Sequence, residues 1–237
     1  MLIRHRTHFF TGLGLLAVFF CVLAFMFSPN FGDINAFQAS DNMFNSISKG
    51  STYYIPQVIK EAKQFRGQQF DIVIESDSPA FTEAAAKLLT VNGFNLEPTK
   101  ATEFRVRGDL GRLMGVALRD SDDMFKNNGP AMEKRYGTAP KQAMYAWWLL
   151  LKKVKLALDR QKNFKPATFI DKRIIARGIE VGYNYFGIEG RKAVDEWGMI
   201  TFALLFYVVY TIWFGYGIFF LFEGVGLQMT AGKKKEM

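Results

Sequence analysis

The strongest hydrophobic signals are two uncharged runs, one near each end of the chain. Residues 9–27 read FFTGLGLLAVFFCVLAFMF, and residues 199–222 read MITFALLFYVVYTIWFGYGIFFLF. As helices they reach about 28 and 36 Å at roughly 1.5 Å per residue, and the hydrocarbon core of a bilayer is about 30 Å thick. The pattern predicts a transmembrane helix at each run.

Between the two runs the pattern changes to that of a water-soluble domain. Residues 28–67, which are polar at first, are predicted to form a linker and a short helix. Residues 68–128 alternate and then repeat with helical spacing, which predicts an α+β module of order β-α-β-β-α. Its elements are a strand at 70–76, a helix at 79–91 with Ser78 as N-cap, strands at 94–97 and 102–108, and a helix at 110–126 with Asp109 as N-cap. Residues 129–198 are predicted to be amphipathic helices.

The stretch MYAWWLLLKKVKLAL, residues 144–158, is too short an apolar run to cross a membrane. Its apolar positions instead form one helical stripe: Met144, Trp147, Leu151, Val154 and Leu158. The spacing predicts an amphipathic helix of about twenty residues that begins at Pro140 and ends before Pro166. Three roles fit it, namely packing in the core, contact with a protein and contact with a membrane surface. The candidate contact residues are Trp147, Trp148, Leu149, Lys152, Lys153 and Leu156.

The first apolar run also resembles a cleaved signal peptide, because it follows a basic start. The best small-residue site, Ala39, has Phe37 where cleavage requires a small side chain, and Phe20 precedes Cys21 where a lipoprotein signal requires one. We therefore expect a retained anchor. Basic residues lie in the tail 1–8 and in the tail 223–237, so the positive-inside rule predicts that both are cytoplasmic. In a bacterial inner membrane the residues between the spans are then periplasmic.

The residue inventory excludes several kinds of chemistry from the predicted domain. The chain has one cysteine, Cys21, and two histidines, His5 and His8, so residues 28–198 contain neither residue type. Serine–histidine, cysteine–histidine and thiolate–metal sites are therefore excluded there. No cofactor motif is present, and we expect no cofactor and no enzymatic activity.

The remaining motifs favour structural roles over chemical ones. The glycines of GDLGRLMG (108–115) match neither a dinucleotide-binding fingerprint nor a P-loop. The acids of RDSDD (119–123) lack the glycine and glutamate of a calcium loop and predict a solvated helix face. Glu75, Asp77 and Asp109 lie at the ends of predicted elements, as catalytic carboxylates often do, but their spacing does not select them.

Charge adds a modest constraint on partners. The chain carries a formal net charge of +8, of which +2 lies in the first tail and +1 after the second run, which leaves +5 for residues 28–198. Such an excess is compatible with solubility alone, and nothing indicates binding to nucleic acid. The second run holds polar aromatic residues along its whole length and not only at its ends, which favours contact with neighbouring helices. The candidates there are Tyr207, Tyr210, Trp213 and, at its end, Glu223.

Together these patterns predict a membrane protein in which two transmembrane helices flank an α+β extracytoplasmic domain. The function that they favour is a non-catalytic structural or accessory subunit of a larger membrane-protein assembly. Its partners would be membrane lipid and either other membrane-protein subunits or further copies of itself. Two alternatives remain open: a carboxylate-dependent enzyme of the cell envelope, and a ligand-binding sensor or transport partner.

The topology is the first testable prediction. Because the two basic flanks agree, reporter fusions at Lys235 should be active only for a cytoplasmic reporter, and fusions near Asn128 only for a periplasmic one. Paired enzymatic reporters at both positions measure this. An active periplasmic reporter at Lys235 would contradict the predicted orientation.

Overall fold

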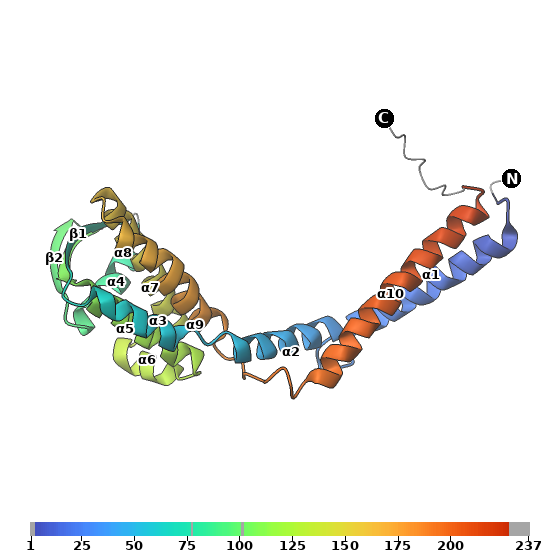
Figure 1. Ribbon diagram of the computed structural model, residues 1–237, viewed down its shortest axis with the longest axis horizontal. Helices are drawn as coiled ribbons and strands as arrows, with labels where there is room; N and C mark the ends of the chain where they lie inside the picture. Colours follow the sequence, from blue (N-terminus) through green and yellow to red (C-terminus); the bar gives the residue numbers. More distant parts are fainter. Residues whose placement is uncertain (1–2, 77, 101, 228–237) are drawn as a thin grey trace. The chain divides into compact units, whose positions relative to one another are not determined.

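The computed structural model describes residues 3–76, 78–100 and 102–227 (Figure 1). The chain forms two compact units, each with its own internal contacts. The first, which we call the hairpin unit, comprises Met1–Ile47 and Arg191–Met237. The second, the central domain, comprises Ser48–Gly190.

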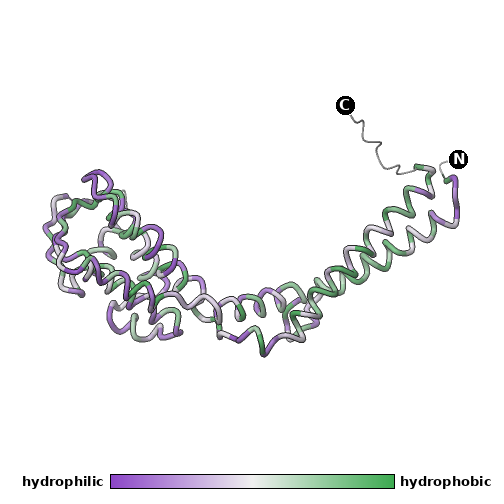
Figure 2. Tube along the Cα trace, viewed as in Figure 1, coloured by the Kyte–Doolittle hydropathy of each residue, from purple (hydrophilic) through white to green (hydrophobic). Residues whose placement is uncertain are grey.

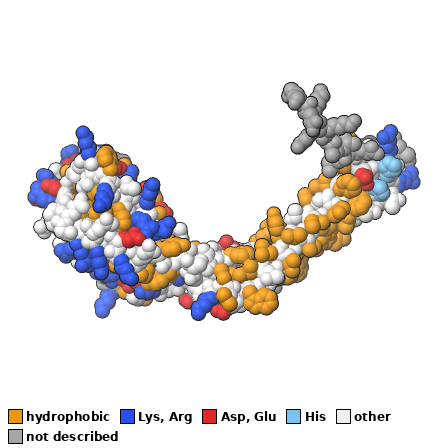
Figure 3. All heavy atoms as spheres, in the orientation of Figure 1, with side chains coloured by type: hydrophobic (Ala, Val, Ile, Leu, Met, Phe, Trp, Pro, Cys, Tyr) orange, Lys and Arg blue, Asp and Glu red, His pale blue; other side chains and the backbone are white. Residues whose placement is uncertain are grey.

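The hairpin unit is dominated by two antiparallel helices, α1 (Arg6–Phe27) and α10 (Trp197–Gly224). Both are long and apolar enough to cross a membrane, and little of either is buried within the protein. Figure 2 shows the apolar character along both helices, and Figure 3 shows hydrophobic side chains over their surface, in contrast to the charged central domain. The two predicted apolar helices are therefore confirmed as long helices.

The two helices pack through a seam whose residues recur every three or four positions, the pattern of a coiled coil. Gly12 of α1 lies against α10 so closely that a Cβ atom there would lie 2.6 Å from the backbone nitrogen of Leu221. Phe19 stacks on Tyr210 with ring centroids 4.2 Å apart, and Trp213 Nε1 donates to the Leu15 carbonyl at 3.1 Å. Tyr210 and Trp213, which the sequence analysis named as candidates for contact with neighbouring helices, thus contact α1 of the same chain.

Helix α2 (Ala36–Ser51) corrects the expectation of a polar linker in this region. Its first turn is held by a reciprocal capping box. Asn35 Oδ1 accepts from the Gln38 backbone N–H at 2.9 Å, and Gln38 Oε1 accepts from the Asn35 backbone N–H at 3.0 Å. This motif satisfies two backbone donors and makes a helix of a segment whose polar composition is otherwise typical of a loop.

The central domain contains a three-stranded antiparallel sheet with strand order β1-β3-β2. The strands are β1 (Gln69–Glu75), β2 (Asn95–Lys100) and β3 (Glu103–Asp109). Helix α4 (Pro79–Val91) connects β1 to β2, and α5 (Leu110–Phe125) follows β3. Ser78 Oγ caps α4 through the Phe81 N–H at 3.3 Å, and Asp109 Oδ1 caps α5 through the Arg112 N–H at 2.7 Å. The predicted β-α-β-β-α order and both N-caps are confirmed.

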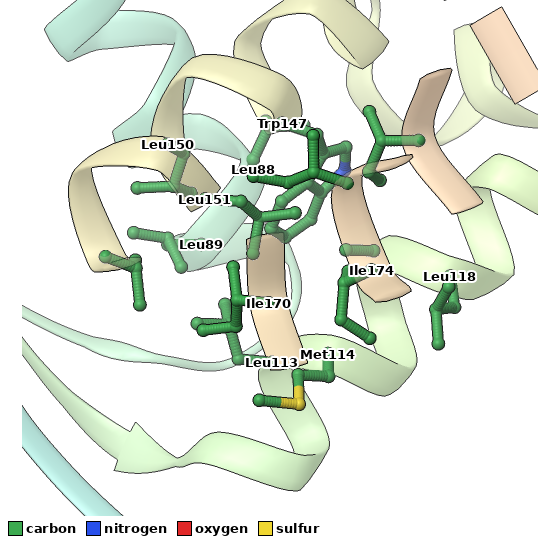
Figure 4. Packing of buried hydrophobic residues seen from close by; sticks show 14 of the residues in the cluster. Leu88, Leu89, Leu113, Met114, Leu118, Trp147, Leu150, Leu151, Ile170 and Ile174 are labelled. Atoms are coloured by element: carbon green, nitrogen blue, oxygen red, sulfur yellow. The ribbon is translucent and has the colours of Figure 1, made fainter. Parts of the chain in front are cut away.

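The other helices of the domain cover and extend this module. They are α3 (Ile55–Ala62), the short 3-10 helix η1 (Lys63–Phe65), α6 (Gly129–Tyr136), α7 (Pro140–Arg160), α8 (Phe164–Phe169), the π-helix η2 (Ile170–Ile179) and α9 (Glu180–Asn184). The five residues of the predicted stripe on α7 are fully buried in the core, and Leu150 joins them. Figure 4 shows Trp147, Leu150 and Leu151 packed among side chains of α4, α5 and η2.

The seam generates a prediction about helix pairing. Gly12→Leu forces the side chain into the α10 backbone, and we expect it to cost the hairpin roughly 1–3 kcal/mol of stability. Gly215→Leu is the matched control, because nothing lies within 4 Å of a Cβ atom at Gly215. Denaturation of the full chain by titration with SDS, followed by circular dichroism, measures both. Equal loss in the two variants would contradict the seam.

Candidate interaction groove

The two adjacent tryptophans of α7 lie about 100° apart around the helix axis, and each indole N–H donates to an acid. Trp147 is fully buried, and its Nε1 donates to Asp120 Oδ2 at 2.8 Å. Trp148 is only half-buried, and its Nε1 donates to Glu180 Oε1 at 3.0 Å. Of the roles that the sequence left open for this pair, core packing is confirmed for Trp147, while Trp148 reaches the surface.

Asp120 of α5 is the buried charge that orients α7. Its side chain is 0% exposed and accepts from Trp147, from the Tyr136 hydroxyl, from Arg135 Nη1 and from Arg119 Nη2 at 3.0 Å. Burial, together with the charge of Asp120, raises the pKa of Tyr136 to about 12, so Tyr136 stays a hydrogen-bond donor at neutral pH. The expectation that the acids of residues 119–123 form a solvated face is wrong for Asp120, because three of its hydrogen-bond donors come from α6 and α7 and were not visible in the local pattern.

A second tight contact positions the helix opposite Trp148. Gly178 and Gly182, four residues apart at the junction of η2 and α9, face α5. A Cβ atom at Gly182 would lie 2.5 Å from Ser121 Oγ, and Ser121 Oγ donates to the Gly178 carbonyl at 2.5 Å. With this edge turned inward, Glu180 and Tyr183 lie on the opposite side of the helix. The sequence GIEVG shows the small-residue spacing that sequence reasoning missed.

Between α7 and the η2–α9 segment lies a surface groove of about 340 Å³. Its walls are mostly aromatic and aliphatic, with one carboxylate, and its residues are Met144, Tyr145, Trp148, Ile179, Glu180, Tyr183 and Asn184. The Tyr145 and Trp148 rings are stacked, with centroids 5.8 Å apart and planes 17° apart. Tyr145 is 53% exposed and Tyr183 is 37% exposed, so the groove is open to solvent along its aromatic walls.

Two lysines lie over the aromatic rings of the groove. Lys152 Nζ lies 3.7 Å from the centre of the Trp148 ring, and Lys141 Nζ lies 5.7 Å from that of Tyr183. Lys100, Lys126 and Lys155 pair with carboxylates of their own neighbourhood. Among the described residues, no carboxylate lies within 4.0 Å of the ammonium of Lys141 or Lys152, so the nearby π-faces are the contacts that the structure shows for these cations.

The other candidates on α7 lie outside the groove. Leu149 is half-buried and packs against the core, and Lys153 is half-buried. Leu156 is 51% exposed and is not among the residues that line the groove. The second contact surface that the sequence suggested for Leu149 and Leu156 is therefore only partly solvent-accessible.

Of the contact residues predicted on the second apolar helix, some lie in the seam with α1 and others on the outer surface of the hairpin. Tyr210 and Trp213 lie in the seam with α1, whereas Tyr207 is exposed on the outer face. Glu223 lies in the last turn of α10 and forms a 2.9 Å contact with His8 Nδ1 of α1. This contact joins the first turn of α1 to the last turn of α10.

Glu75 and Asp109, two of the carboxylates considered for catalysis, do not lie close together in the structure. In the register of β1 and β3, Glu75 lies opposite Glu103 at one end, and Asp109 lies opposite Gln69 at the other end. At about 3.3 Å per residue, Glu75 and Asp109 are therefore roughly 20 Å apart. Both oxygens of Asp109 already accept backbone N–H groups, from Arg112 and Gly67, while Asp77 lies outside the described residues. No group of three or more metal-ligating side chains occurs within the described ranges.

Lys49 is a buried cation that sequence reasoning missed. Its ammonium donates to the Tyr185 carbonyl at 3.0 Å, the Ile188 carbonyl at 2.5 Å and Asn127 Oδ1 at 3.2 Å, and it lies 5.0 Å from the Phe125 ring centre. Burial lowers its pKa, and the charge of Glu189 opposes that shift. These bonds fasten the first residues of the central domain to its last turn, so we assign Lys49 a structural role.

Comparison of the chain with protein-family models, with curated proteins and with solved structures finds no match.

The Asp120 network generates a prediction about stability. Asp120→Asn removes the charge that compensates Arg135 inside the fold, and we expect it to cost about 3–5 kcal/mol. Asp122→Asn on the same helix is the control, because that carboxylate is 22% exposed and pairs with the exposed Lys126, so its loss should cost about 1 kcal/mol or less. Urea unfolding of the full chain in detergent, followed by tryptophan fluorescence, compares the two. A cost for Asp120→Asn no larger than that of the control would contradict the network.

Proposed function

We propose that the protein is a non-catalytic accessory subunit of a membrane-protein assembly, anchored by its hairpin and presenting the central domain for protein contacts. In this proposal α1 and α10 cross a bacterial inner membrane with both tails in the cytoplasm. The central domain then lies in the periplasm, in agreement with the basic residues at Arg4 and Arg6.

The observation that supports this function is the exposed aromatic groove. Aromatic side chains are enriched in the buried centres of protein interfaces, and Tyr and Trp dominate binding hot spots. Here Tyr145, Trp148 and Tyr183 are held on packed helices but left open to solvent. A rigid, partly solvated aromatic surface of this kind is well suited to receive a side chain from a partner.

The same geometry is less suited to the two alternatives. Small-ligand sites enclose most of their ligand, whereas this groove is open along Tyr145 and Tyr183. An envelope enzyme that uses paired carboxylates needs them about 5–10 Å apart, and Glu75 and Asp109 lie at opposite ends of a strand. Contact with a partner protein through the groove therefore fits the observed surface better than either alternative does.

The outer face of the hairpin offers a second surface for lipid or for a neighbouring subunit. Phe202 of α10 is 62% exposed and stacks on Phe206, with ring centroids 6.0 Å apart. Tyr207 beside them is exposed as well. These side chains lie at membrane depth in the proposed topology, where helix neighbours supply hydrogen bonds that lipid tails do not.

Gentle purification from native membranes tests the proposed function. We expect the wild-type protein to emerge with stoichiometric partners or as a homo-oligomer, and Tyr145→Ala to reduce the recovered complex about tenfold, the change that 1.4 kcal/mol produces. Leu156→Ala is the matched control, since Leu156 is equally exposed on the same helix but lies outside the groove. Recovery of the wild-type protein only as a monomer would contradict the proposal.

A further inference from the structure

The charge arrangement of the groove points to the chemistry of its partner. We propose that the groove binds an acidic segment of another protein, in which one apolar side chain lies between two acidic residues. This inference rests on the proposed function and deepens it, because it specifies what the partner presents.

Two lysines of α7 flank the groove. Lys141 and Lys152 each lie over an aromatic wall, and neither is neutralised by a carboxylate of the described residues. Both lysines are exposed, so their ammonium groups are accessible to a partner. Carboxylates of a partner complement them, and such pairs in the rim of an interface give specificity and speed of association.

The middle of the groove favours an apolar side chain over an acidic one. Glu180 lies there with Oε1 bound to the Trp148 indole, and the surrounding walls are Met144, Ile179 and Tyr145. A second carboxylate at this point is repelled by Glu180, whereas an apolar side chain gains contact with the walls. The groove therefore selects an acidic–apolar–acidic order and disfavours a uniformly acidic segment.

The distance between the two lysines sets the spacing of the acidic residues in the partner. Lys141 and Lys152 are eleven positions apart on α7, which is roughly 16 Å at about 1.5 Å per residue. An extended segment covers this distance in about five residues at roughly 3.3 Å each. We expect acidic residues about five positions apart, with the apolar anchor between them.

Anionic lipid headgroups are another source of negative charge, but the features of the groove favour a protein. A bilayer surface presents no apolar group between two charges at a fixed spacing, and Glu180 repels headgroups at the centre. The groove between Tyr145 of α7 and Tyr183 of α9 fits a protruding side chain better than it fits a flat bilayer surface. Binding to lipid is accordingly an outcome that the experiment distinguishes.

Site-specific photocrosslinking of the full chain in its native membrane tests the inference. Tyr145 is replaced by benzoylphenylalanine, and the crosslinked peptide is identified by mass spectrometry. We expect a protein crosslink whose peptide carries Asp or Glu on both sides of an apolar residue near the site. Adding Lys141→Glu or Lys152→Glu should reduce its yield about tenfold, and Lys134→Glu, an exposed lysine on α6 with the same change of charge, should leave it unchanged.

The other outcomes overturn the inference in distinguishable ways. A crosslink to a neutral or basic segment, or one equally sensitive to Lys134→Glu, refutes the acidic partner but leaves the accessory-subunit function standing. A crosslink to lipid alone, or no crosslink while the purified complex persists, shows that the groove is not the protein contact. No crosslink together with a monomeric protein from native membranes contradicts both proposals. Thermal unfolding of each variant confirms that the fold survives the substitution.

Discussion

The buried carboxylate of Asp120 is the interaction on which the arrangement of the central domain depends. An ion removed from water costs several kcal/mol unless its neighbours compensate it. Here they come from two other helices, as Tyr136 and Arg135 of α6 and Trp147 of α7 converge on one side chain of α5. This convergence fixes the rotation of α7 about its axis. With Trp147 bound inward, Trp148 lies about 100° further around the helix, at the edge of the buried face.

The groove follows from that rotation and from one further contact. Gly178 and Gly182 let the η2–α9 segment lie directly on Ser121, so Glu180 meets Trp148 across the gap between the helices. Its aromatic walls therefore stand on packed helices and not on loops, which keeps their geometry defined. A surface of this kind loses little side-chain entropy on binding, because Tyr and Trp have few rotatable bonds. The aromatic groove with its two uncompensated lysines is in this sense prepared for an acidic, apolar-centred segment.

The two helices of the hairpin unit are also held together by close backbone approach and by aromatic contacts. Its helices expose apolar side chains to their surroundings and meet through Gly12 and through rings such as Phe19 and Tyr210. In an apolar environment helices gain little from hydrophobic burial, so close backbone approach and bonds such as Trp213 to the Leu15 carbonyl hold them together. In the proposed topology this hairpin anchors the protein, and the central domain is left to make contacts with partners.

The sequence by itself determined the features that depend on local periodicity: the two apolar helices, the β-α-β-β-α order and the buried stripe of α7. It also contained the Asn35–Gln38 capping box of α2, which was overlooked because the segment is polar. Only the tertiary structure decided the burial of Asp120, the approach of Gly12 to Leu221, and the meeting of Trp148 with Glu180. In each case the two sides lie far apart along the chain, and the free energy comes from desolvation or close contact between them. A pattern read along one segment reports which face of a helix is apolar, but which partner covers that face is settled by packing alone.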